Sequence, residues 1–207
     1  MNGIDGLNER LHEIRKVFKL AFCALKEQKQ VWEKCMDSAR LHLTAIVTLR
    51  EIQVNCRTAK LAGSELFSKY PDVRQRVVSC VEDELFQEKT KLESITKSLK
   101  KAQNIFSSAC QQAIKTYEKL SQDRSVEDIC YRSEIYPSVA DMLEWITSTE
   151  QQFSSHIHAR ELLLEETCFG DDYKVDVFVR EWKDDTALME SLNDVLTTAK
   201  VYKSKMT

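Results

Sequence analysis

The stretch LNERLHEIRKVFKLAFCALKEQKQVWEKCMDSARLHLTAIVTLREIQVNC (residues 7–56) decides the fold of this chain. Apolar and small residues recur in it at alternating steps of four and three, which is the spacing of one stripe along a helix. No glycine or proline interrupts the stretch, so it predicts one long helix with a coiled-coil-like seam. The two seam positions are Leu7, Ile14, Ala21, Gln28, Cys35, His42, Leu49, Cys56 and Leu11, Phe18, Leu25, Trp32, Ala39, Ile46, Gln53.

A second long helix is predicted over residues 72–120. Gly63 and Pro71 bracket the connection before it, and proline suits the first turn of a helix because its missing N–H costs nothing there. Two helices of similar length joined by a short link fold back most simply as an antiparallel hairpin. Glu88 is the one charged break in the second seam, which reads Val78, Val81, Leu85, Leu92, Ile95, Leu99, Ala102, Phe106, Ala109, Ala113, Leu120.

A polar loop is predicted over residues 121–136, and Pro137 ends it. Ser138 suits the N-cap of a third helix over residues 139–167, with Asp141 three positions later to complete a capping box. Gly170 fits the position just past the end of that helix. Two shorter helices are predicted to follow, over residues 173–183 and 185–202.

Turn-forming residues are scarce along the whole chain. Its 207 residues include four glycines and two prolines, where average usage gives about 25. Sandwiches, barrels and propellers need many turns, and Rossmann or P-loop folds need glycines beside phosphates. The prediction is an all-α, elongated bundle in which the long antiparallel hairpin packs with the third helix and the short C-terminal helices. We expect residues 1–207 to form a single domain, with residues 121–137 as its weakest point.

Net charge and cysteine usage limit the kinds of ligand and the cellular compartment that fit this chain. Thirty basic against 33 acidic residues give a net charge of -3, which provides no field toward nucleic acid or anionic lipid. The longest apolar run, residues 20–25, is far short of a membrane span. Seven cysteines without a C-x-x-C pair indicate a reducing compartment and no zinc ribbon. We expect most of these cysteines to fill the core.

Motifs for catalysis or metal binding are missing from the pattern. A di-iron bundle needs Glu-x-x-His on two helices, and the chain has it once, as Glu9-x-x-His12. There is neither a P-loop nor a G-x-S-x-G elbow. We therefore expect no catalytic residue, cofactor or metal. His42, on the first seam, is expected to be a buried, hydrogen-bonded residue that sets helix register.

Two further features can be explained by ordinary helix packing and solvation. Five lysines lie between Lys89 and Lys101, but glutamates dilute them and no aromatic residues interleave for base stacking. We interpret this stretch as a solvated helix face, without sequence-specific nucleic-acid binding. Trp32, Trp145 and Trp182 fit either a core or a partner contact, since tryptophan is common in both.

The run Pro137-Ser-Val-Ala-Asp-Met-Leu-Glu-Trp145 resembles the start of the third helix in a family of ribosome maturation factors. These factors are small helical adaptor subunits that partner AAA ATPases of the Drg1/spermatogenesis-associated type. Other pieces agree in order along the chain. Glu27-Gln28 followed by Trp32 resembles the family's E-Q-Q-x-x-W stretch. Phe67, then Tyr70-Pro-Asp-Val-Arg-Gln-Arg76, resembles the start of its second helix, and Gly170-Asp171 with Trp182 resembles its C-terminal part.

The resemblance implies a non-enzymatic subunit of an AAA ATPase hexamer, together with a second small helical subunit. In this family the complex acts on late pre-ribosomal large subunits in the cytoplasm. There it releases a maturation factor so that the factor can be recycled, and a further role in replication and chromatin proteostasis is proposed. Family members are found in the cytoplasm and the nucleus. Contact with the pre-ribosome would be indirect, and no membrane is involved.

The same resemblance suggests surfaces for partner contact. The helical pattern alone leaves open a structural coiled-coil subunit of a cytoskeletal, kinetochore or tethering assembly. Ser138 and Asp141 are equally well explained as a helix cap. The residues expected to contact a partner are Trp32, Arg76, Ser138, Asp141, Glu144 and Trp145.

Overall fold

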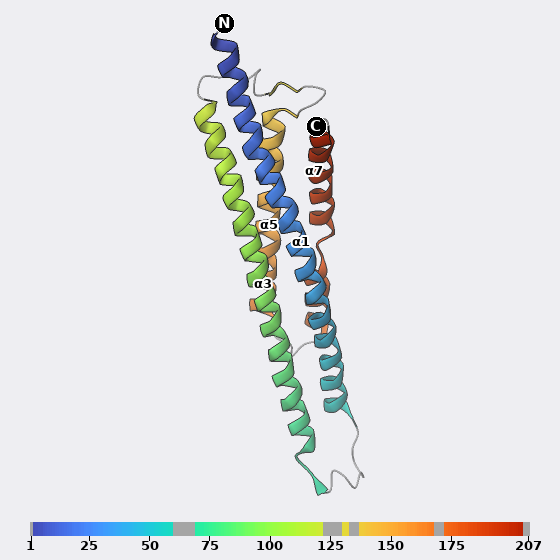
Figure 1. The fold of residues 1–207 in the computed structure, drawn as a ribbon. Helices are drawn as coiled ribbons and strands as arrows, with labels where there is room; N and C mark the ends of the chain where they lie inside the picture. The colour runs from blue at the N-terminus through green and yellow to red at the C-terminus, as the bar shows by residue number, and fades with distance from the viewer. Residues whose placement is uncertain (1, 60–68, 122–129, 133–136, 168–171, 205–207) are drawn as a thin grey trace. The chain divides into compact units, whose positions relative to one another are not determined.

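A computed structural model describes residues 2–59, 69–121, 130–132, 137–167 and 172–204 (Figure 1). These ranges contain no β-strand, which confirms the predicted all-α helical bundle. Gly63, Cys168 and Gly170 lie outside them. The helices are α1 (Asn2–Thr58), α3 (Val73–Leu120), α5 (Val139–Glu166), α6 (Asp172–Lys183) and α7 (Thr186–Ser204).

Helices α3, α5, α6 and α7 begin and end within two residues of their predicted bounds, whereas α1 begins at Asn2, five residues before the predicted stretch 7–56. The start of α3 needs one correction, since Pro71 lies in a turn before the helix rather than in its first turn. In this turn the Val73 N–H donates to the Tyr70 carbonyl at 3.2 Å, and the Arg76 N–H donates to the Asp72 carbonyl at 3.0 Å. Asp72 therefore occupies the N-cap of α3.

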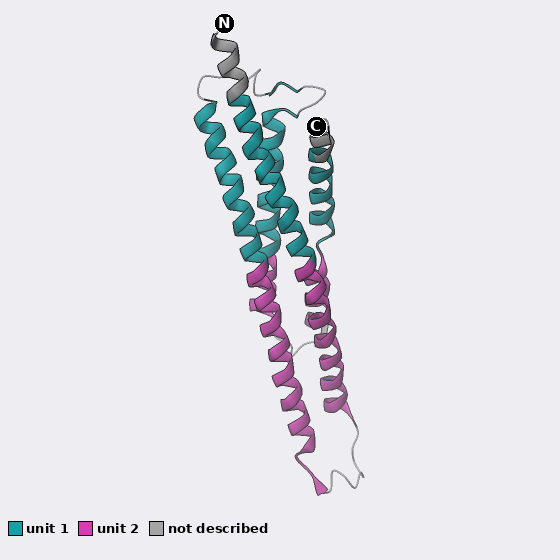
Figure 2. Cartoon of the chain, in the orientation of Figure 1, with its two compact units in different colours: residues 1–33, 99–158, 185–207 teal, residues 34–98, 159–184 magenta. Residues whose placement is uncertain are grey.

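The chain divides into two compact units (Figure 2). Unit 1 comprises residues 1–33, 99–158 and 185–207, and unit 2 comprises residues 34–98 and 159–184. The division falls within α1, α3 and α5. It does not fall at residues 121–137, because the helices on both sides of that segment belong to unit 1 there. The expectation of a single domain stays a prediction.

Unit 1 packs the N-terminal half of α1 and the C-terminal half of α3 with most of α5 and with α7 (Figure 2). Aromatic rings fill its centre: Phe153 lies 5.2 Å from Trp32 and 5.9 Å from Phe106, measured between ring centroids. Fully burying such side chains contributes about 1.5–3 kcal/mol each. The other buried apolar residues are Ile14, Phe18, Ala21, Leu25, Leu99, Ala102, Cys110, Ala113, Val139, Met142, Ile146, Ile157, Leu188 and Leu192.

Unit 2 carries polar pairs inside its hairpin. His42 Nδ1 on α1 lies 2.7 Å from Glu88 Oε2 on α3, and Lys91 Nζ lies 2.6 Å from Glu88 Oε1. Burial by itself raises the pKa of Glu88, but its hydrogen bonds to Lys91 and His42 and their charges bring the pKa below its ordinary value. The predicted hydrogen bond of His42 is thus present, although the side chain is half-buried rather than buried, at 24% exposed.

Three further contacts of polar side chains hold unit 2. Gln53 on α1 donates to Glu82 on α3 at 2.9 Å, and Arg57 lies at the same distance from that carboxylate. Arg160 on α5 is 1% exposed and lies over the Trp182 ring of α6, 5.3 Å from its centroid. A buried cation on an aromatic face contributes roughly 2 kcal/mol.

Burial along α1 follows the predicted seam to Trp32 and then changes register. Three consecutive buried positions, Gln28, Trp32 and Met36, are separated by two steps of four. A helix of 3.6 residues per turn drifts by about 20° per heptad, so such a stutter returns the stripe to the core. The buried residues after it include Met36, Leu43 and Arg50, in place of the half-buried Cys35, His42 and Leu49.

The same drift corrects part of the seam of α3. Thr96 and Cys110 are buried, whereas the predicted Ile95 and Ala109 are half-buried. The expectation that most cysteines fill the core is also wrong for the described residues. Only Cys110 is buried there, while Cys35 and Cys56 are half-buried and Cys23, Cys80 and Cys130 are exposed. All six are free thiols.

Candidate functional site

The first turn of α5 carries the predicted capping box. The Asp141 N–H donates to Ser138 Oγ at 3.0 Å, and the Ser138 N–H donates to Asp141 Oδ2 at 2.9 Å. Two backbone donors that the helix leaves unpaired are thereby satisfied reciprocally. Ser138 is 4% exposed, so its hydroxyl is committed to the cap and not presented to a partner.

Arg132 ties the segment before α5 to this cap. Its Nε lies 3.0 Å from Asp141 Oδ2, and its Nη2 lies 2.9 Å from Asp141 Oδ1. Burial raises the pKa of Asp141, but the hydrogen bonds from Ser138 and the paired guanidinium outweigh it and lower the pKa. Because Asp141 is 22% exposed on its side chain, one edge of this ion pair meets solvent.

Trp145 lies one turn beyond Asp141 and is half-buried. Its ring packs against Phe22 of α1, with centroids 6.2 Å apart and planes tilted by 59°. Glu144 beside it is exposed, and so is Tyr131 at 66%. We call the group Tyr131, Arg132, Asp141, Glu144 and Trp145 the α5 N-terminal surface.

This surface has the composition of a protein interface. Tryptophan, tyrosine and arginine are the residues most enriched among interface hot spots. A bidentate pair between Arg132 and Asp141 fixes the geometry of the charges in this surface. The surface therefore offers aromatic contact area next to an acidic edge formed by Asp141 and Glu144.

Trp32 does not belong to this surface. Its side chain is 0% exposed, and its Nε1 donates to Asp185 Oδ2 at 3.2 Å. The His156 ring lies perpendicular to the indole, with centroids 6.4 Å apart. A residue enclosed in this way by its own chain has no side-chain area to offer a partner. The expected partner contact of Trp32 is corrected to a core role.

Arg76 is exposed on α3 and belongs to unit 2, whereas the other five predicted residues belong to unit 1. Its guanidinium pairs with the Asp72 carboxylate, with Nη2 at 2.6 Å and Nε at 2.7 Å from Oδ2. An exposed pair four residues apart on a helix contributes about 0.3–0.5 kcal/mol. Its partner role stays a prediction.

Sequence reasoning missed Tyr131, Arg132 and Phe22. Arg132 and Tyr131 lie in a segment without helical period, so no pattern indicates which side chains meet α5. Phe22 lies off the seam of α1, where an aromatic residue next to an alanine gives only a weak signal. Its proximity to Trp145 depends on how two helices pack.

The described residues also bear on metal binding and membrane insertion. No cluster of three or more His, Cys, Asp or Glu side chains in the described ranges could hold an ion. None of the described helices combines the length and the apolar character needed to cross a bilayer.

Comparison with known proteins places this geometry in context. A family model described as "Ribosome biogenesis protein C1orf109-like" matches residues 12–201, a range that includes all six predicted site residues. Three similar proteins are named "AFG2-interacting ribosome maturation factor". That of Mus musculus is 21% identical over 169 residues, covering 82% of this chain and 78% of the relative. That of Homo sapiens is 22% identical over 171 residues, covering 82% and 83%. That of Xenopus tropicalis is 24% identical over 175 residues, covering 82% of each.

Proposed function

This chain belongs to the C1orf109-like ribosome biogenesis family, and from that membership we propose that it is a non-enzymatic adaptor for an AAA ATPase of the AFG2 kind. The match over residues 12–201 carries the proposal, because it includes most of every described helix rather than one motif. The relatives' shared name supports the choice of ATPase, since it states an interaction with AFG2.

The sequence resemblance also suggests the second subunit, the substrate and the compartments of this complex, and we include them in the proposal. The chain joins the ATPase hexamer together with a second small helical subunit. The complex acts on the large ribosomal subunit in the cytoplasm, where it releases and recycles a maturation factor, and it also serves replication and chromatin proteostasis. The chain itself is present in cytoplasm and nucleus. ATP hydrolysis comes from the partner, because this sequence has no P-loop.

The α5 N-terminal surface is the contact we assign to the ATPase. Trp145 is held against Phe22 and Arg132 against Asp141, so these side chains lose little conformational freedom on binding. The exposed Glu144 would face a basic patch of the partner. A structural coiled-coil role would use the helical seams instead and leave this surface without a partner.

Purification of the tagged chain from cell extract at low salt tests the proposal. We expect an AAA ATPase and a second small helical protein to be recovered with it. A chain that sediments as a free monomer under conditions that preserve complexes contradicts the adaptor role. A stable assembly on a cytoskeletal or kinetochore structure without an ATPase would favour the structural alternative.

The variant Glu144→Lys tests the assigned surface. Because this side chain is exposed, its reversal should leave the fold intact. We expect ATPase recovery to fall about fivefold or more, as a loss of about 1 kcal/mol in binding would produce. Glu190→Lys, at an exposed glutamate of α7 in the same unit, is the matched control. Equal recovery by both variants would remove Glu144 from the interface.

A further inference from the structure

The C-terminal half of α3 presents a line of basic and uncharged polar side chains. Successive members are three or four residues apart, so they share one helix face. The opposite face of the same segment is the core stripe of Ala102, Phe106, Cys110 and Ala113. The exposed members are Lys101, Asn104, Ser108, Gln111, Lys115 and Lys119, and we call this line the α3 basic face.

Local charge on this segment runs against that of the whole chain. Residues 99–120 hold four lysines and one glutamate, whereas the chain has a net charge of -3. Several lysines elsewhere are paired, for example Lys29 with Glu33 at 2.5 Å and Lys91 with Glu88 at 2.6 Å. In the described part of the chain no ion pair engages Lys115 or Lys119. Their charges are therefore open to an external anion.

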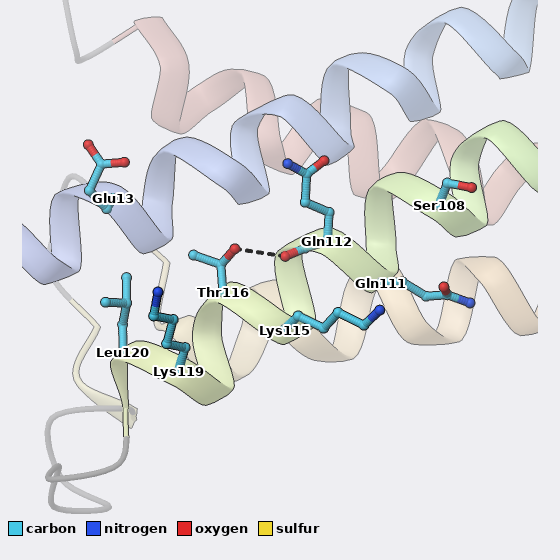
Figure 3. Close-up of a pocket in the computed structure, with 8 residues that line it drawn as sticks. All are labelled: Glu13, Ser108, Gln111, Gln112, Lys115, Thr116, Lys119 and Leu120. Carbon is cyan, nitrogen blue, oxygen red and sulfur yellow. Dashed lines mark hydrogen bonds between the residues drawn. The ribbon is translucent and has the colours of Figure 1, made fainter.

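An open groove of about 550 Å³ lies at the end of this face (Figure 3). From α3 it is lined by Ser108, Gln111, Gln112, Lys115, Thr116 and Lys119, among others. Its one acidic lining residue, Glu13 of α1, has its carboxylate 3.6 Å from Lys16 Nζ, so a neighbour already offsets that charge. The groove therefore joins two cationic groups to the amides of Gln111 and Gln112. The hydroxyls of Ser108 and Thr116 donate to the backbone carbonyls of Asn104 and Gln112, both at 2.8 Å, and keep only acceptor capacity toward a ligand.

These side chains suit a sugar-phosphate backbone better than bases. Lysines act as point charges for phosphates, and amide side chains hydrogen-bond to phosphate and sugar oxygens. No aromatic residue belongs to the α3 basic face, so unstacked bases have no platform. Helical RNA is contacted through its phosphates and the 2′-hydroxyls of its shallow groove. Lys101 and Lys119, 18 positions apart, span about 27 Å of helix.

We propose that the α3 basic face binds the backbone of double-stranded RNA independently of sequence. Membership of a ribosome biogenesis family favours RNA over an acidic protein surface as the polyanion. The inference rests on that membership and on the face itself, and it holds whether or not an ATPase binds the α5 N-terminal surface. It replaces the expected purely indirect link to the pre-ribosome with a direct contact.

Fluorescence anisotropy with an RNA duplex of about 20 base pairs tests the proposal in the full-length chain, at salt from about 50 to 200 mM. We expect a Kd on the order of 10⁻⁶–10⁻⁴ M at physiological salt, as for sequence-independent binding. Lys115→Gln/Lys119→Gln should weaken binding and reduce the salt slope by about 2, one for each lysine. Glutamine retains helix propensity, and circular dichroism verifies the fold.

The matched control is Lys19→Gln/Lys26→Gln, which removes two exposed lysines of α1 in the same unit. It should leave the slope unchanged, and an equal loss in this control overturns the assignment to α3. Equal affinity for a DNA duplex of the same sequence, or for a polyglutamate peptide of equal charge, overturns the choice of RNA. Absence of binding at the lowest salt overturns the proposal outright. ATPase recovery by Lys115→Gln/Lys119→Gln should be normal, which separates this inference from the adaptor role.

Discussion

The indole Nε1 of Trp32 donates a hydrogen bond to Oδ2 of Asp185 over 3.2 Å, joining the middle of α1 to the N-cap of α7. Asp185 also accepts the Met189 N–H at its carbonyl, at 2.9 Å. The Asp185 carboxylate thus accepts a hydrogen bond from the buried indole, and the Asp185 carbonyl accepts the first backbone hydrogen bond of α7. A buried indole N–H needs such a partner, because leaving it unpaired costs about 1–3 kcal/mol.

A double-mutant cycle on this pair should reveal coupling. Trp32→Phe removes the donor, Asp185→Ala removes the acceptor, and the double variant removes both. We expect the free energy of unfolding to show a coupling of about 0.5–1.5 kcal/mol in urea titrations followed by circular dichroism. Asp194→Ala, at an exposed position of α7, should show none with Trp32→Phe. Additive effects at Trp32 and Asp185 would mean that the contact adds nothing to stability.

The cap of α5 should make stability depend on pH through Asp141. Its folded pKa lies below the ordinary value, so its contribution is present above the unfolded pKa of about 3.9 and is lost as pH falls through the folded pKa. Asp141→Asn removes this contribution. The stability difference between the wild type and the variant should therefore be largest near neutral pH and shrink in acid. A difference that stays constant between about pH 7 and pH 3 would contradict the assignment.

Breaking the His42–Glu88 pair by one substitution should destabilise the protein, whereas replacing both residues should be tolerated. His42→Leu leaves the buried Glu88 without this hydrogen bond, and Glu88→Leu leaves the half-buried His42 without it. Either single loss should cost about 1–3 kcal/mol. The double variant puts apolar side chains on both helices and should recover most of that loss. Thermal unfolding of the three variants measures this directly. A double variant as unstable as the sum of the singles would show that the pair does not act as a unit.

Cys110 should resist alkylation in the folded chain. Burial, followed by the negative charge of Glu150, raises the pKa of its thiol to about 12, and only the thiolate reacts. Iodoacetamide near pH 8 should label the exposed Cys23, Cys80 and Cys130 and spare Cys110 until urea is added. Mass spectrometry of the peptides reads this out. Rapid native labelling of Cys110 would place it outside the core.

The helix spans could be predicted because long seams and a few punctuating residues determine them locally. The Ser138–Asp141 cap illustrates this, since its two reciprocal hydrogen bonds join residues only three positions apart. The meeting of His42 with Glu88 could not be predicted, although both stood out as polar breaks. Their pairing depends on the register between two helices, and a heptad pattern is compatible with shifts of seven.

The α5 N-terminal surface could also be predicted only in part from the sequence. Asp141, Glu144 and Trp145 follow from one distinctive run at the start of α5. Arg132 approaches them from a segment whose path no periodicity encodes. Trp32 was misplaced because a tryptophan on a seam carries the same sequence signal in a core as in an interface, and only its neighbours separate the two.

The proposed adaptor role makes this chain a subunit of an AAA ATPase assembly. Native mass spectrometry of the complex purified through the tagged chain tests it most directly. The adaptor role predicts a species whose mass equals an ATPase hexamer plus this chain and a second small subunit. A spectrum that contains only the free chain, or an assembly without an ATPase, would contradict it.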